Sequence, residues 1–170
     1  MAGAAHGAER QRALRAAVEE MERRRDGKVP WDATLAEAFA DRADLVLALH
    51  ARWHRVLAVR LDPLLEQGCS ATEVVHAWYA WAAETPGQRA VLDAAAGDPW
   101  PMLTAAGTRQ DALLAVAAGL AVPGADRRLS AAVWRTALAS YRPAPPRASL
   151  RERMAAWYAR RPCPLRAAAA

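Results

Sequence analysis

Apolar residues recur every three or four positions between Arg42 and Gln67, and this spacing is typical of a helix that buries one face. The apolar stripe contains Val46, Leu49, His50, Trp53, Leu57, Leu61 and Leu64. His54 follows His50 by four positions but is displaced from the stripe. Pro63 is expected to kink or interrupt the last turn, and Gly68 is expected to end the helix. The sequence therefore predicts one long amphipathic helix over this segment.

The rest of the chain contains little material for strands. It has 45 alanines among 170 residues, no isoleucine, eleven valines and three tyrosines. Alanine and leucine favour helices, whereas β-branched and aromatic residues favour strands. The hydrophobic fraction of 54% is high enough to form a core. We therefore predict an all-α protein, a compact bundle of about seven or eight helices joined by short connections.

Residues that favour helix ends separate the remaining helices. Ser70-Ala71-Thr72-Glu73 has the order of a capping box, which predicts a helix N-terminus. Thr85 followed by Pro86 repeats this pattern, because proline is favoured at the first helical position. Further helix starts are predicted at Glu9, near Asp32, at Asp41, at Met102 and at Asp126.

The chain is predicted to divide into four parts. Residues 1–8 form a flexible N-terminus, and residues 9–141 form the helical bundle domain. Residues 142–148 contain three prolines and are expected to be an extended linker, because proline cannot continue a helix. Residues 149–170 are predicted to form a short basic helix and a tail, introduced by a capping box at Ser149.

Tryptophan is frequent, with seven tryptophans for one phenylalanine. Trp53, Trp78, Trp81 and Trp134 fall on predicted inner faces, where each would bury roughly 150 to 250 Å2. We expect these side chains to fill the core and to leave no room for a reaction centre, with the lining of a binding pocket as the alternative. The predicted inner stripe of the last bundle helix contains Leu129, Val133, Ala137 and Tyr141.

The net charge of +5 is unevenly distributed along the chain. Residues 31–126 carry six basic and twelve acidic groups, whereas residues 127–170 carry ten basic groups and one acidic group. Only one basic residue of 23 is a lysine, so the abundance of arginine reflects a general bias and is weak evidence for phosphate recognition.

The basic C-terminal segment contains aromatic side chains among its arginines. The residues that would contact nucleic acid or a partner are Arg147, Arg151, Arg153, Trp157, Arg160 and Arg161. Arginines can follow a phosphate backbone while an aromatic ring stacks on bases, although no helix-turn-helix or RNP signature accompanies them. The segment could instead dock on the acidic middle of the same chain or of a neighbour, lie on a membrane surface, or bind a protein partner.

His50 and His54 lie one helical turn apart, so their side chains project from the same side and could ligate one metal ion or a haem iron. Glu73 and His76 have the Glu-x-x-His spacing of di-iron bundles. We expect Glu73 and His76 to face solvent, and a second Glu-x-x-His motif is missing from the sequence. The metal-site hypothesis therefore rests on His50 and His54, against the alternative of one partly buried histidine and two exposed ones.

The sequence contains none of the motifs that commonly carry catalysis. It has no Gly-x-Ser-x-Gly, no P-loop and no Gly-x-Gly-x-x-Gly. Cys69 and Cys163 lie 94 residues apart without a Cys-x-x-Cys partner, which fits a reducing cytoplasm. The longest uncharged stretch, Ala112 to Ala125, has 14 residues, fewer than the roughly 20 that cross a bilayer. We therefore expect a cytoplasmic protein with no membrane span and no cofactor.

The leading hypothesis is a small non-catalytic helical protein with an interaction or regulatory role, which acts through a protein partner or through self-association. One alternative is a regulator that binds nucleic acid through the arginine-rich C-terminal segment. Another is a metal- or haem-binding bundle that uses His50 and His54. Convergence of the histidines on a common cavity would favour a site inside the bundle over the leading hypothesis.

Overall fold

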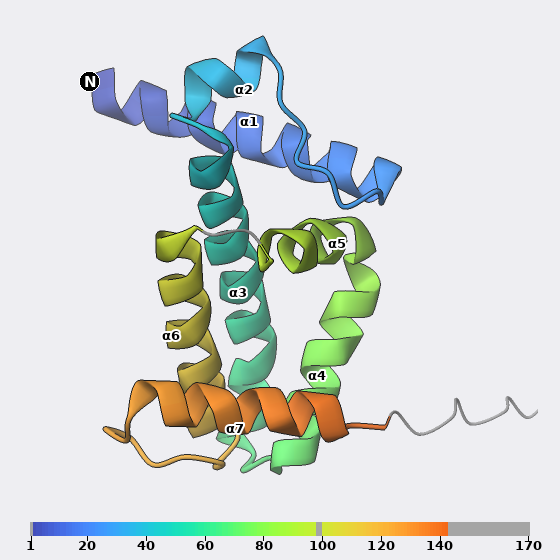
Figure 1. The fold of residues 1–170 in the computed structure, drawn as a ribbon, viewed down its shortest axis with the longest axis vertical. Helices are drawn as coiled ribbons and strands as arrows, with labels where there is room; N and C mark the ends of the chain where they lie inside the picture. The colour runs from blue at the N-terminus through green and yellow to red at the C-terminus, as the bar shows by residue number, and fades with distance from the viewer. Residues whose placement is uncertain (1, 98–99, 143–170) are drawn as a thin grey trace, which may run out of the picture.

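The computed structural model describes residues 2–97 and 100–142 (Figure 1). The described residues contain seven helices and no strand, which confirms the predicted all-α bundle. The helices are α1 (Ala2–Arg24), α2 (Ala33–Ala38), α3 (Arg42–Glu66), α4 (Ala71–Glu84), α5 (Pro86–Ala95), α6 (Pro101–Ala117) and α7 (Arg127–Ser140). The predictions for the linker after Arg142 and for the basic helix and tail at 149–170 lie outside the described residues.

The long helix α3 runs along the middle of the bundle (Figure 1). It packs against α4, α5 and α6, and α1 crosses its N-terminal end. The helix α7 lies across the opposite end of the bundle and packs against α6. Within the described ranges, no helix is both long enough and apolar enough to cross a membrane.

Local sequence signals explain most helix ends. The capping box is confirmed: Ser70 Oγ accepts from the Glu73 N–H at 3.4 Å, and Glu73 Oε2 accepts from the Ser70 N–H at 2.8 Å. The helix α3 continues through Pro63 to Glu66. The helix α1 begins at Ala2 and not at the predicted Glu9, because the alanines that precede Glu9 favour helix.

The N-terminus of α5 is capped by a side chain from another helix. The Glu22 carboxylate of α1 accepts from the backbone N–H groups of Gly87 and Gln88, each at 3.0 Å, and from Gln88 Nε2 at 3.1 Å. The two helices approach so closely that a Cβ atom on Gly87 would lie 2.1 Å from the Met21 carbonyl oxygen. The contact between α1 and α5 therefore depends on a glycine at position 87.

Thr85 occupies the predicted N-cap position of α5, but its hydroxyl does not cap the helix as Ser70 caps α4. Instead, Thr85 Oγ1 donates to the Trp81 carbonyl oxygen at 2.7 Å and accepts from Trp53 Nε1 at 2.9 Å. The indole N–H of a buried tryptophan needs an acceptor. The Thr85 hydroxyl therefore forms its hydrogen bonds within the core of the bundle and not with the N-terminus of α5.

Three of the four tryptophans predicted for the core are buried there. Trp53 and Trp134 are fully buried, and Trp81 is 8% exposed. Trp78 is half-buried and stands edge-on to Trp53, with 5.6 Å between the ring centroids. Trp78 therefore lies at the boundary between the core and an open space.

The predicted inner stripe of α7 is wrong in part. Leu129 and Val133 are exposed by 69% and 43%, whereas Ser130, Ala131 and Trp134 are buried. Burying the large Trp134 ring removes more apolar surface from water than burying Leu129, so it sets the orientation of the helix. An exposed apolar pair suits the predicted protein contact, which stays a prediction.

Candidate functional site

A cleft of about 360 Å3 opens beside α3, and residues of α3 to α7 line it. Its titratable side chains are His50, His54, Arg89, Asp93, Asp111 and Arg135, its hydroxyl side chains are Thr104 and Thr108, and its large apolar ones are Trp78, Leu92, Leu103 and Leu138. We call it the imidazole cleft. A cleft of this volume suits a small organic molecule. The expectation that the tryptophans fill all the space between the helices is therefore wrong at Trp78.

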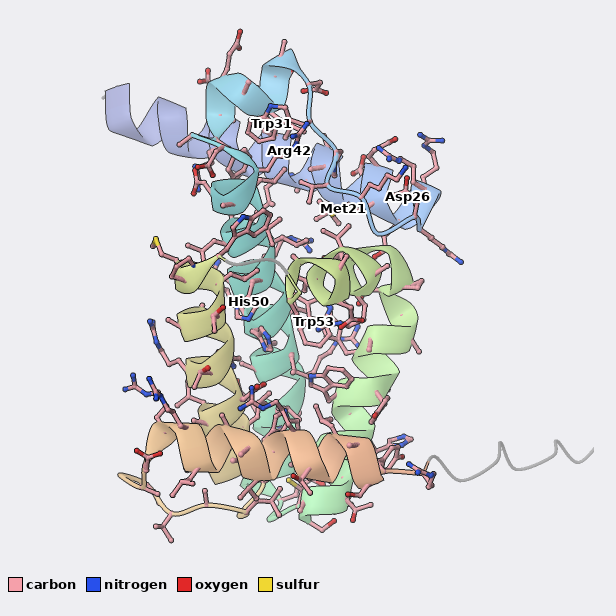
Figure 2. The ribbon with its side chains drawn as sticks, in the orientation of Figure 1. Met21, Asp26, Trp31, Arg42, His50 and Trp53 are labelled. Carbon is pink, nitrogen blue, oxygen red and sulfur yellow. The ribbon has the colours of Figure 1, made fainter. Side chains whose placement is uncertain are left out.

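The two histidines of α3 form the inner part of the imidazole cleft. Their rings lie 4.4 Å apart between centroids and are tilted by 50°. His50 is half-buried and lies on the side of α3 toward α6, while Trp53 lies on the side toward α4 and α5 (Figure 2). His54 is only 8% exposed, and its Nδ1 atom has no hydrogen-bond partner.

The sequence placed His50 on the buried stripe of α3 and His54 beside it, whereas His54 is the more deeply buried of the two. The physical reason is that α3 is a central helix. Because α4, α5 and α6 all pack against it, its buried arc is wider than the single stripe of a surface helix.

Burial keeps both imidazoles neutral. Loss of hydration, together with the smaller effect of the Arg89 charge, lowers the pKa of His50 from 6.5 to about 4. The pKa of His54 falls from 6.5 to about 3, first through loss of hydration and then through His50 and Arg89. A neutral imidazole has one N–H donor and one nitrogen acceptor. The pair therefore offers hydrogen bonds to a ligand without offering charge.

Arg89 of α5 brings a fixed positive charge to the imidazole cleft. Its guanidinium lies 5.2 Å from the centroid of the Trp53 ring and 5.5 Å from that of Trp78. It also forms an ion pair with Asp93 at 2.6 Å. Contacts with two indole faces and one carboxylate hold the guanidinium in one place.

Asp111 of α6 and Arg135 of α7 lie next to each other in the lining of the imidazole cleft. The shortest distance between the Asp111 carboxylate and the Arg135 guanidinium is 3.9 Å, which is too long for a hydrogen bond. Burial raises the pKa of Asp111 from 3.8 to about 6, although Arg135 and Arg89 oppose this rise. Because Asp111 and Arg135 are not hydrogen-bonded to each other, each can form a hydrogen bond with a polar group of a ligand.

The predicted metal ligands His50 and His54 are brought together, but no third ligand joins them among the described residues. Those residues contain no group of three or more His, Cys, Asp or Glu side chains that could hold a metal ion. His76 is exposed elsewhere and shares a 2.7 Å hydrogen bond with Tyr141 Oη. Glu73 caps its own helix. The metal and haem hypotheses stay predictions that rest on the same two imidazoles.

The residues predicted to contact nucleic acid or a partner lie outside the described part of the chain. They are Arg147, Arg151, Arg153, Trp157, Arg160 and Arg161. The contrast between a basic C-terminal segment and an acidic middle of the chain still motivates that prediction.

Sequence reasoning identified the histidines of the imidazole cleft but missed Arg89, Asp111 and Arg135. These three residues come from α5, α6 and α7, and no local motif connects them. Asp111 directly follows the polar segment Thr108-Arg109-Gln110, so the local sequence contains no signal that its carboxylate faces inward.

Comparisons with models of protein families, with curated proteins and with solved structures find no match to this chain. The function of this chain is therefore inferred from the geometry and chemistry of the cleft itself.

Proposed function

We propose that this protein binds a small organic molecule in the imidazole cleft and acts as a ligand-responsive regulatory protein. The ligand has an apolar body and at least one hydrogen-bonding group. The observation that carries the proposal is the buried His54 ring, whose Nδ1 atom has no hydrogen-bond partner although its ring lines the cleft. Leaving such an atom unpaired costs about 1 to 3 kcal/mol, and a ligand gains this affinity if the His54 ring turns its enclosed Nδ1 atom toward the cleft.

The lining of the imidazole cleft indicates that the part of the ligand that contacts the two histidines is uncharged. Both imidazoles are neutral at pH 7, so they favour a hydroxyl, an amide or a ring nitrogen over a fully charged group. Trp78 and Leu103 supply apolar contacts to the body of the ligand. This is the usual composition of a small-molecule site, with few polar groups in an apolar wall.

Filling the imidazole cleft is expected to weaken ligand binding without unfolding the protein. A Cβ atom on Gly107, which lines the cleft within α6, meets no heavy atom within 4 Å. Gly107→Leu therefore places a side chain in open space, and it also replaces a poor helix former with a good one. We expect the variant to bind 2-naphthol, a fluorescent molecule with one hydroxyl, at least about tenfold more weakly than the wild type.

Gly7→Leu is the matched control, because Gly7 lies in α1 and its added Cβ also meets nothing within 4 Å. The control is expected to bind 2-naphthol as the wild type does, and circular dichroism checks the fold of both variants. Equal binding by the two variants, or no binding by the wild type, would contradict the proposed function.

Other parts of the functional prediction belong to the same proposal. A cytoplasmic location and a protein partner are supported by the two isolated cysteines and by the uneven charge along the chain. A regulatory protein of this kind would bind its partner in a manner that depends on whether the imidazole cleft holds its ligand.

A further inference from the structure

A second, shallower groove lies between α6 and the first turns of α7. It has a volume of about 870 Å3, and its polar lining includes Thr104, Thr108, Asp126, Arg127, Arg128 and Arg135. We call it the arginine groove. An open groove of this kind holds the polar end of a ligand more readily than an apolar one, because its floor stays in contact with water.

The arginine groove is continuous with the imidazole cleft. Thr104, Thr108 and Arg135 line both of them. Arg135 therefore stands where the two spaces meet, with Asp111 on the side of the cleft. A molecule that occupies the cleft can extend into the groove past these shared residues.

The arginine groove carries a net positive charge. Three guanidinium groups line it against the single carboxylate of Asp126. That carboxylate is already engaged as the cap of α7, since its Oδ1 atom accepts from the N–H groups of Arg128 at 3.0 Å and Leu129 at 2.9 Å. Within residues 2–97 and 100–142, Arg127 and Arg128 form no ion pair, and Arg135 has only the long contact with Asp111.

We propose that the ligand of the imidazole cleft carries an anionic group, such as a phosphate, sulfonate or carboxylate, which lies in the arginine groove. This inference rests on the proposed function and names its ligand class as an anionic amphiphile. The apolar body and the hydrogen-bonding group lie in the cleft, and the charged end contacts Arg127, Arg128 and Arg135. Guanidinium groups bind such anions through charge-assisted hydrogen bonds.

The test compares three probes at constant ionic strength. 6-Hydroxynaphthalene-2-sulfonate has the body and hydroxyl of 2-naphthol and adds an anionic group at the far end, while sodium sulfate supplies an anion without the body. We expect the sulfonate to bind the wild type at least about tenfold more tightly than 2-naphthol, and sulfate alone to bind far more weakly than the sulfonate.

A double variant locates the anion. Arg127→Gln with Arg128→Gln is expected to remove most of the advantage of the sulfonate and to leave 2-naphthol binding unchanged. The matched control is Arg15→Gln with Arg55→Gln, which removes the same charge from two exposed arginines that line neither space. This control is expected to bind the sulfonate as the wild type does.

The outcomes separate this inference from the proposed function. If 2-naphthol binds and the sulfonate gains nothing, the anionic ligand class is wrong while the imidazole cleft remains a binding site. Equal losses in the two double variants would show general charge attraction and would overturn the arginine groove. Sulfate that binds as tightly as the sulfonate would mean an adventitious ion only, and failure of every probe would overturn both proposals.

Discussion

Replacement of Gly87 by alanine is expected to lower the free energy of unfolding by about 3 kcal/mol or more. The added Cβ would lie 2.1 Å from the Met21 carbonyl oxygen, 2.4 Å from its carbonyl carbon and 2.6 Å from Glu22 Cα. All three are backbone atoms, so no side-chain rotation relieves the clash. To accept the methyl group, α1 has to move away from α5 and the Glu22 carboxylate loses its bonds to the start of α5.

Urea denaturation followed by circular dichroism measures this loss. Gly107→Ala is the control, because its Cβ meets nothing within 4 Å and the change is made inside a helix. Alanine at this position is expected to raise the free energy of unfolding by about 0.5 to 1 kcal/mol. A Gly87→Ala protein as stable as the wild type would show that α1 does not pack on α5 as described.

The stability contributed by His54 is expected to fall by about 4 kcal/mol as the pH drops from above 6.5 toward 3. The pKa of this imidazole is about 3 in the folded chain and 6.5 when it is hydrated. When the pKa of a base is lower in the folded chain than in the unfolded chain, the base makes its full contribution to stability at pH values above the unfolded pKa. Acid then favours the unfolded chain, because only there does the imidazole take up a proton easily.

Acid has the opposite effect on the contribution of Asp111 to stability, so the pH dependence of the unfolding free energy combines the effects of Asp111 and His54. Its pKa is raised from 3.8 to about 6, which means that protonation on acidification favours the folded state. The contribution of His54 is isolated by comparing the wild type with His54→Gln over a pH series. The difference in unfolding free energy should shift by about 4 kcal/mol in favour of the variant between pH 7 and pH 3.

The exposed His76 supplies the control for this titration. A His76→Gln protein shows what the loss of a histidine and of its hydrogen bond with Tyr141 does outside the imidazole cleft, and the effect of His54→Gln is measured against it. Parallel curves for the wild type and His54→Gln would show that His54 is not held neutral by burial. They would also remove the argument that the imidazole cleft offers uncharged hydrogen-bonding groups.

Much of the fold could be predicted from the sequence because most helix ends are marked by nearby residues. Ser70 and Glu73 form the predicted capping box, since all its atoms come from one short segment. The cap of α5 could not be predicted, because Glu22 is 65 positions away from Gly87 along the chain. Its identification requires knowing that α1 packs against α5.

Local sequence patterns also could not predict which face a helix buries when it contacts several neighbouring helices. Periodicity describes a helix with one buried face, and it placed His54 beside the stripe of α3. Three packing partners widen the buried arc of α3 and enclose His54. In α7, the single large ring of Trp134 outweighs the apolar spacing of Leu129 and Val133, which remain exposed.

The candidate site was predictable only in part, for the same reason. The four-residue spacing of His50 and His54 guarantees that the rings meet on one side of a helix. The other charged groups that line the cleft with those rings come from three other helices, and they include Arg89, Asp111 and Arg135. Which helices pack together depends on the whole set of apolar contacts and not on any one motif.

The most direct test of the account is the state of the His54 imidazole nitrogens, measured by long-range proton–nitrogen NMR correlation at pH 7 with and without 2-naphthol. We predict a neutral ring whose Nδ1 signal moves on addition of the ligand, while the His76 signals stay in place. A doubly protonated His54 ring, or His54 signals that do not move at saturating ligand, would contradict the assignment of the imidazole cleft as a binding site.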